Sequence, residues 1–175
     1  MLKEKLLATG LDRVEELPVS EIPFEPSLID LCAANRCGNY NRCWTCPPRN
    51  GEISSLMTTA KKFRTAFVFQ KIYQIEDSFD IEGMFEANKK FQRIIVRLAE
   101  TFSQEKEEVL LLGAGGCRIC AVCAAVEEKP CRHPDLACPS LESYGIQVSE
   151  LAQRCGMNYI NGVNTVTYFG AVLQP

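Results

Sequence analysis

The sequence contains no apolar run long enough to cross a membrane as a helix. Its first ten residues, Met1 to Gly10, also lack the apolar core and the cleavage signal of a secretory peptide. These two absences predict a cytoplasmic protein with no membrane partner, in which cysteine thiols stay reduced.

Basic residues are not in excess either. The chain has 19 Lys and Arg against 22 Asp and Glu, a net charge of −3. We therefore expect no nucleic-acid partner, although a local basic patch is compatible with this balance. The chain also lacks internal repeats, low-complexity segments and a recognisable catalytic acid–base set. With 175 residues, 46% of them hydrophobic, it predicts a single domain over residues 1–175.

What the sequence has in excess is cysteine, with ten residues. In a reducing compartment closely spaced thiols bind metals more often than they form disulfides. Nine of them fall into two groups, within residues 32–48 and 113–139, and all nine are candidate metal ligands. They are Cys32, Cys37, Cys43 and Cys46 in the first group and Cys117, Cys120, Cys123, Cys131 and Cys138 in the second.

The spacing of the second group favours an iron–sulfur cluster. Thiolates at Cys117, Cys120 and Cys123 can bind three iron corners of a cubane, and the fourth ligand often precedes a proline. Cys46 and Cys138 both precede prolines. The two groups together predict one or two [4Fe-4S] clusters, and they are expected to lie side by side in the fold.

Zinc is the alternative metal. Structural zinc sites pair two Cys-x2-Cys units, and Cys43 with Cys46 and Cys117 with Cys120 have this spacing. Cys123 repeats the spacing once more, which zinc does not need and a cubane uses. The spacing therefore favours iron–sulfur over zinc.

Other residues near the cysteines have predicted roles. The run Gly113–Gly116 lacks the spacing of a dinucleotide or P-loop motif, so Gly115 and Gly116 are expected to let backbone N–H groups approach the cofactor. Trp44 is expected to pack the first loop onto the core, and Cys155 to be a small buried hydrophobe. His133 either completes the site or shapes the loop. Four arginines could offset the negative charge of a cluster: Arg36, Arg42, Arg118 and Arg132.

Hydrophobic periodicity predicts the elements between the loops. Short helical turns are expected within residues 1–17 and an extended connection over 18–27. We expect helices over 53–63, 81–102 and 148–157, and strands over 65–75, 109–112 and 164–173, with a hairpin turn at 158–162. This order predicts an α+β fold, a small, mostly antiparallel sheet with helices on one face and the two cysteine-rich loops at one end. A doubly wound α/β sheet is the alternative.

Four segments together resemble a known family. They are Cys37-Gly-Asn-Tyr to Cys46-Pro-Pro, Gly113-Ala-Gly-Gly-Cys-Arg-Ile-Cys-Ala-Val-Cys, Pro130-Cys-Arg-His-Pro, and Cys138-Pro-Ser-Leu-Glu-Ser-Tyr-Gly-Ile. They are similar to the cysteine-rich prokaryotic family labelled "predicted metal-binding protein", a domain of unknown function common in anaerobes. The resemblance implies a metal, and a cluster in particular. Cys43 is additional to the family pattern, and Cys32 stands at a less regular spacing.

These features lead to three hypotheses for the function. The first is an iron–sulfur protein that transfers electrons to a redox partner protein. The second is a redox enzyme or enzyme subunit with an open cluster site, in which Cys131 or His133 is a replaceable ligand or a proton donor. The third is a zinc-stabilised adaptor protein. Enzymatic activity and self-association into a homo-oligomer are left open by the sequence.

Overall fold

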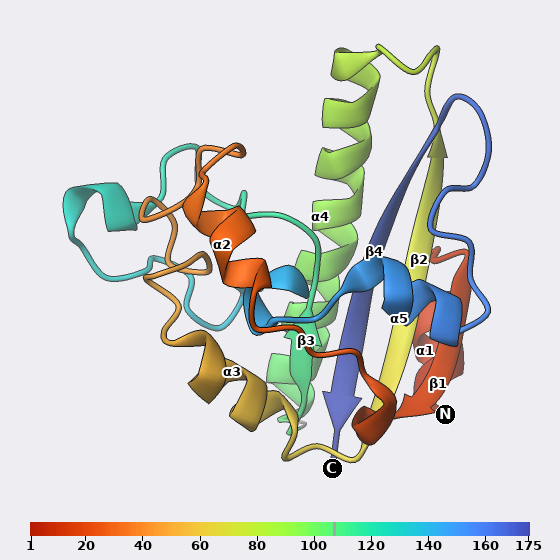
Figure 1. The fold of residues 1–175 in the computed structure, drawn as a ribbon, viewed down its shortest axis with the longest axis horizontal. Helices are drawn as coiled ribbons and strands as arrows, with labels where there is room; N and C mark the ends of the chain where they lie inside the picture. Colours follow the sequence, from red (N-terminus) through yellow and green to blue (C-terminus); the bar gives the residue numbers. More distant parts are fainter. Residues whose placement is uncertain (107) are drawn as a thin grey trace.

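A four-stranded antiparallel sheet forms the centre of the computed structural model, which describes residues 1–106 and 108–175 (Figure 1). Its strands lie in the order β1-β2-β4-β3, and each neighbouring pair is antiparallel. The strands are β1 (Arg13–Pro18), β2 (Thr65–Gln74), β3 (Leu110–Leu112) and β4 (Thr165–Gln174). The α+β prediction is confirmed, because the doubly wound alternative would require a mainly parallel sheet.

Helices and short helical turns connect the strands. The α-helices are α1 (Leu2–Leu7), α2 (Leu28–Ala33), α3 (Ile53–Ala60), α4 (Ile81–Glu105) and α5 (Val148–Arg154). The 3-10 turns are η1 (Val19–Glu21), η2 (Ala124–Glu127) and η3 (Glu142–Tyr144). Among the described residues, no helix combines the length and the apolar character needed to span a membrane.

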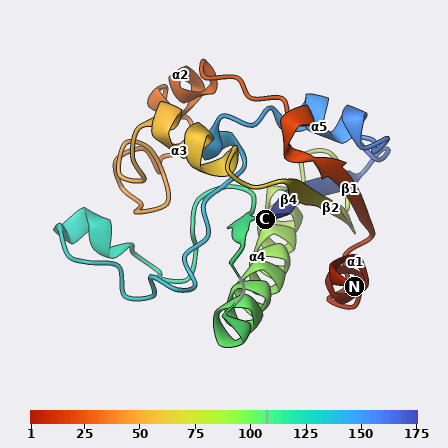
Figure 2. The ribbon, with the colours of Figure 1, turned by 90° about the horizontal axis from the view of Figure 1, so that it is seen from below.

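Helices cover both faces of the sheet, so the prediction of helices on one face only is wrong. Side chains alternate along β2: Phe67 and Phe69 face one core, and Ala66 and Val68 face the other. The first core is formed with α1 and α4, and the second with α3, α5 and η3 (Figure 2). The sheet is therefore the middle of three layers.

The helix α4 forms where the sequence predicts it because its apolar residues recur on one face. Six of its residues are buried: Ala87, Phe91, Ile94, Ile95, Leu98 and Phe102. The carboxylate of Asp80 caps its start by accepting a hydrogen bond of 2.7 Å from the backbone N–H of Gly83. The opposite face is exposed, and it lies beside the second cysteine loop.

Most predicted elements are confirmed, and three local predictions are wrong. Residues 13–18 form strand β1 rather than a helical turn, and residues 28–33 form helix α2 at the entrance to the first cysteine loop. No hairpin forms at residues 158–162. Instead β4 pairs with β2 and β3, which come from distant parts of the chain.

The second cysteine loop is closed at its base by hydrogen bonds. The N–H of Gly113, directly after β3, donates to the carbonyl of Pro139 at 2.8 Å, and the N–H of Leu141 donates to the carbonyl of Gly113 at 3.0 Å. Residues 113–139 therefore leave the sheet and return to it at one point. Both cysteine loops lie to the β3 side of the sheet, next to α2 and α3 (Figures 1 and 2).

The close approach of β3 and β4 depends on Gly170. A Cβ atom at this position would overlap the ring of Phe69 and lie 2.7 Å from the backbone oxygen of Leu112. We expect Gly170→Ala to lower the free energy of unfolding by roughly 1–3 kcal/mol, because the added methyl group overpacks the core. Urea denaturation measures this change.

Gly113→Ala is the matched control. A Cβ atom there would meet Ile95 at 3.5 Å, which is an ordinary contact. Its free energy of unfolding should change by less than about 1 kcal/mol. Equal stability of the two variants would contradict the proposed packing at Gly170.

Candidate metal centre

Four cysteines from the two loops line one hollow of about 420 Å³. Cys43 comes from the first loop, and Cys117, Cys120 and Cys123 come from the second. The two cysteine groups therefore lie side by side, as the sequence predicts, and the first contributes Cys43, which is additional to the family pattern. The ligand roles of these thiols stay predictions.

The hydroxyl of Thr45 joins the two loops at this hollow. Its oxygen accepts a hydrogen bond from the backbone N–H of Cys117 at 3.3 Å, and it lies 3.2 Å from the sulfur of Cys43. Thr45 and Cys43 are both buried. Because a buried hydroxyl needs hydrogen-bond partners, this contact fixes how the first loop docks on the second.

Trp44 and Arg49 hold the loops together from outside. The indole N–H of Trp44 donates to the carbonyl of Lys129 at 2.9 Å. The guanidinium of Arg49 forms a forked pair with Glu128 and stacks over the Trp44 ring at 5.4 Å. Trp44 thus packs the first loop against the second loop, not against the sheet core as predicted.

The thiols affect one another electrostatically. Burial raises the pKa of Cys117 to about 11, and negative charge on Cys43, Cys131 or Cys123 would raise it further. A hydrogen bond from Cys46 lowers the pKa of Cys43, and the same bond raises that of Cys46. Cys117 and Cys43 are therefore the points at which the two cysteine groups meet.

Cys32, Cys37 and Cys46 do not line the hollow, but they interact with one another and, through Cys46, with Cys43. Burial raises the pKa of Cys32, and a charge on Cys37 adds to this increase. Cys37 contributes in the same direction to the raised pKa of Cys46, after the hydrogen bond with Cys43 and burial. Cys37 is itself exposed, at the surface of the first loop. These three thiols form a set distinct from the residues that line the hollow.

Cys131 and Cys138 do not line the hollow, although each interacts electrostatically with Cys117. Cys131 lines a neighbouring cavity of about 510 Å³ together with Trp44 and Tyr144. The thiol of Cys138 donates to the carbonyl of Leu111 at 3.2 Å, packs against the core beneath α4, and has a pKa raised by burial. Cys131 follows a proline and Cys138 precedes one, but neither lines the hollow with Cys120 and Cys123.

The glycines allow the close approach of the two loops. A Cβ atom at Gly116 would lie 2.8 Å from the side-chain nitrogen of Asn39 in the first loop. Gly115 adopts a φ of +73°, a backbone conformation that residues other than glycine rarely adopt. The predicted contact of Gly115 and Gly116 with a cofactor stays a prediction, whereas the close approach of Gly116 to the first loop is visible in the structure.

The charged residues predicted near the cysteines divide into two kinds. Arg42 and Arg118 line the hollow, and Arg132 instead donates to the carbonyl of Val122 at 2.9 Å, inside the loop. Arg36 is exposed. His133 is also exposed, and its carbonyl accepts two backbone hydrogen bonds within the turn that follows, so it shapes the loop.

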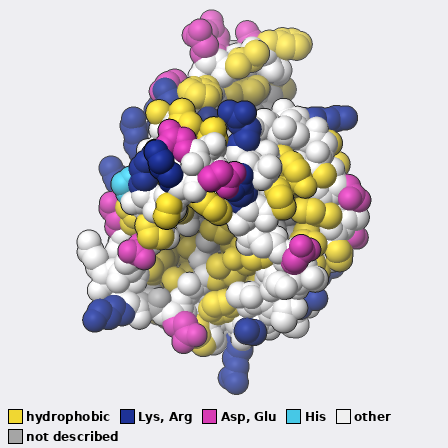
Figure 3. All heavy atoms as spheres, turned by 90° about the vertical axis from the view of Figure 1, so that its left-hand side faces the viewer, with side chains coloured by type: hydrophobic (Ala, Val, Ile, Leu, Met, Phe, Trp, Pro, Cys, Tyr) yellow, Lys and Arg dark blue, Asp and Glu magenta, His cyan; other side chains and the backbone are white. Residues whose placement is uncertain are grey.

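Cys155 packs against the core beside α5, as predicted for a small hydrophobe. The sequence reasoning missed Thr45, Arg49 and Asn39. Only Thr45 carried a usable signal, because it stands between Cys43 and Cys46. The face that carries the two loops shows hydrophobic side chains interspersed with charged side chains of both signs (Figure 3).

The donors around the hollow are thiols, which suit a thiophilic metal. Within residues 1–106 and 108–175, no three His, Cys, Asp or Glu side chains are grouped so that they could hold one metal ion. Tetrahedral zinc would bring its sulfurs to within about 4 Å of one another. Four cysteines nevertheless line one hollow, and thiolate is a ligand for both zinc and iron–sulfur clusters.

One family model matches the chain, over residues 15–174, and it describes a "Predicted metal-binding protein (DUF2284)". The chain belongs to this family. The match covers both cysteine loops and the whole sheet except the first two residues of β1. It confirms the resemblance found in the sequence. No curated protein and no solved structure matches the chain. Membership of DUF2284 supports a metal-binding role without naming the metal.

Thr45→Val tests how the loops are joined. The substitution keeps the shape of the side chain but removes the hydroxyl that accepts the Cys117 N–H. We expect the free energy of unfolding to fall by about 1–3 kcal/mol, because a buried donor is left without a partner. Urea denaturation of the metal-free protein measures this loss.

Thr58→Val makes the same chemical change on the exposed side of α3. The hydroxyl of Thr58 donates only within its own helix, to the carbonyl of Ser54 at 2.8 Å. This control should change the free energy of unfolding by no more than about 0.5 kcal/mol. Equal losses in the two variants would show that the hydroxyl of Thr45 has no special part in docking the loops.

Proposed function

We propose that this protein binds a [4Fe-4S] cluster through Cys43, Cys117, Cys120 and Cys123 and transfers electrons to a redox partner protein. The observation that carries the proposal is the convergence of these four thiols on one hollow of about 420 Å³. Three of them have the spacing that suits the corners of a cubane, and the first loop supplies the fourth.

The other residues around the hollow suit a negatively charged cofactor. Arg42, Lys89 and Arg118 line it, and their positive charges would offset the charge of four thiolates. A bound cluster would supply reversible one-electron chemistry. The chain's own contribution is to hold the four thiols and to balance their charge.

Apolar side chains also border the hollow. Phe85, Val122 and Val126 line it, and all three are exposed to solvent. Exposed apolar residues at the edge of a charged site are typical of surfaces that contact another protein. Their position next to the thiols supports transfer of electrons to a partner that docks there.

The lining offers little for acid–base catalysis. Among the described residues that border the hollow, none is a carboxylate or a histidine. Proton transfer to a substrate usually requires such a group within hydrogen-bond reach. This composition favours electron transfer over the alternative of a redox enzyme that acts at the hollow.

Anaerobic purification tests the cofactor directly. We expect a brown protein with about four iron atoms and about four acid-labile sulfides per chain. Dithionite should reduce it to a paramagnetic state visible by electron paramagnetic resonance, and reoxidation should restore the absorbance. About eight irons would indicate that Cys32, Cys37 and Cys46 belong to a second cluster. A colourless protein with stoichiometric zinc would contradict the proposal.

Single cysteine substitutions test the ligands. Cys120→Ser and Cys43→Ser should each lower the iron content at least severalfold, because each removes a thiol that lines the hollow. Cys155→Ser is the matched control, since this residue packs beside α5, and its iron content should equal that of the parent. If Cys43→Ser keeps all its iron and Cys138→Ser or Cys46→Ser loses it, the fourth ligand is the cysteine that precedes a proline and not Cys43.

A further inference from the structure

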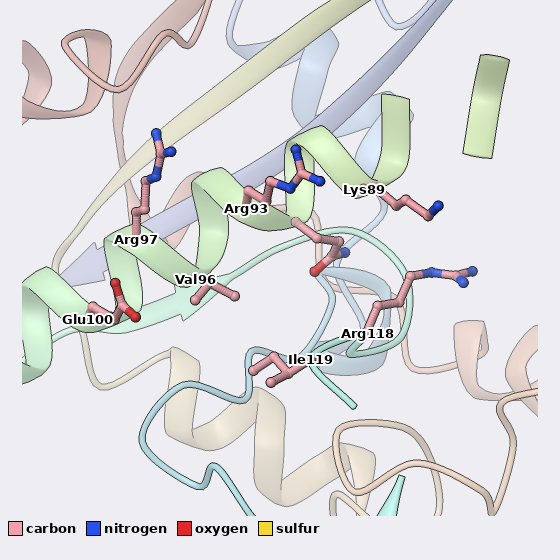
Figure 4. A pocket seen from close by; sticks show the side chains of 8 residues that line it. Lys89, Arg93, Val96, Arg97, Glu100, Arg118 and Ile119 are labelled. Atoms are coloured by element: carbon pink, nitrogen blue, oxygen red, sulfur yellow. The ribbon is translucent and has the colours of Figure 1, made fainter. Parts of the chain in front are cut away.

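A second hollow, of about 520 Å³, lies between the exposed face of α4 and the segment Arg118–Ile119 of the second cysteine loop (Figure 4). Lys89, Arg93 and Arg97 line it from α4. They follow one another at four-residue intervals, so they form one stripe about 12 Å long on the helix. Arg118 adds a fourth positive charge from the loop. We call this hollow the basic groove.

Glu100 also lines the basic groove, so one carboxylate faces its four positive charges (Figure 4). Lys89 pairs with Glu86 at 2.8 Å. In the part of the chain that the structure describes, no carboxylate forms a salt bridge with Arg93, Arg97 or Arg118. Like charges four residues apart on a helix repel one another. The groove therefore carries four positive charges and one negative charge, in a protein whose net charge is −3.

The walls of the groove are partly apolar and held in place. Val96 on α4 and Ile119 on the loop lie toward each other in the gap (Figure 4). The side-chain amide of Gln92 donates to the carbonyl of Ala114 at 2.8 Å, which ties the start of the loop to the helix. The four cations are exposed at the rim of the groove, so they are accessible to an anion from solvent.

Arg118 is also held in position from the other side. Its guanidinium lies over the ring of Phe85 at 5.2 Å, and the ammonium of Lys89 lies over the same ring at 4.9 Å. Arg118 and Lys89 line both the basic groove and the cysteine hollow. An anion in the groove would consequently lie next to the candidate metal centre.

We propose that the basic groove binds a small anion that carries two phosphate or carboxylate groups. Guanidinium groups bind both kinds of group through paired hydrogen bonds. A stripe of three cations suits two separated negative charges, and the volume of the groove falls within the usual range of small-molecule sites. The groove's own residues make this binding, so it does not require the cluster proposed for the neighbouring hollow.

Isothermal titration calorimetry on the full chain tests the proposal, with fructose 1,6-bisphosphate and succinate as probes at fixed ionic strength. We expect saturable binding of at least one probe, and the probe that binds distinguishes phosphate from carboxylate. Arg93→Gln combined with Arg97→Gln should weaken that binding at least tenfold. Glutamine is a good helix former, so α4 should persist, which circular dichroism checks. Arg97→Gln alone serves if the double variant does not fold.

Lys62→Gln combined with Arg64→Gln is the charge-matched control, since both residues are exposed and lie outside the groove. Its affinity should change less than twofold. Three results would overturn the proposal: neither probe binds, both double variants lose affinity equally, or a single-stranded oligonucleotide binds in place of the small anions. Titration of the Cys120→Ser variant separates failure of the anion site from failure of the proposed cluster, because the groove should still bind its anion when iron is lost.

Discussion

The docking of the two cysteine loops depends on one buried hydroxyl. The hydroxyl of Thr45 accepts a hydrogen bond from the N–H of Cys117 and contacts the sulfur of Cys43. It thus links the first-loop cysteine that lines the hollow to the first of the three second-loop cysteines that line it. Trp44 and Arg49 reinforce the same contact at the surface. Thiols that are far apart in the sequence become neighbours because polar side chains of one loop form hydrogen bonds with the other loop.

The sheet contributes to the site mainly through position. Strand β3 is only three residues long and ends at Gly113, where the second loop begins and to which it returns. The exposed face of α4 borders the loop from the other side, with Lys89 and Arg118 between the cysteine hollow and the basic groove. A metal centre and an anion site at this junction would share two cations, so the charge state of one would affect the other.

The sequence predicted those parts of the fold in which burial leaves a periodic pattern. Helix α4 and strands β2 and β4 bury residues at regular intervals and were located closely. Strand β1 was missed because only Val14 and Leu17 are buried in it, and they face opposite cores. The spacing of the cysteines identified the candidate ligands. It could not show that Cys43, rather than Cys46 or Cys138, lines the hollow, because that depends on how the loops dock.

The central position of β4 has a consequence for the order of folding. This strand lies between β2 and β3, and its residues pair with β2 residues about a hundred positions earlier in the sequence. Both cysteine loops are therefore synthesised before the sheet that supports them can close. Until residues 165–174 have left the ribosome and inserted, the thiols belong to an incomplete scaffold. The two loops reach their final places on the sheet only after the last strand has paired.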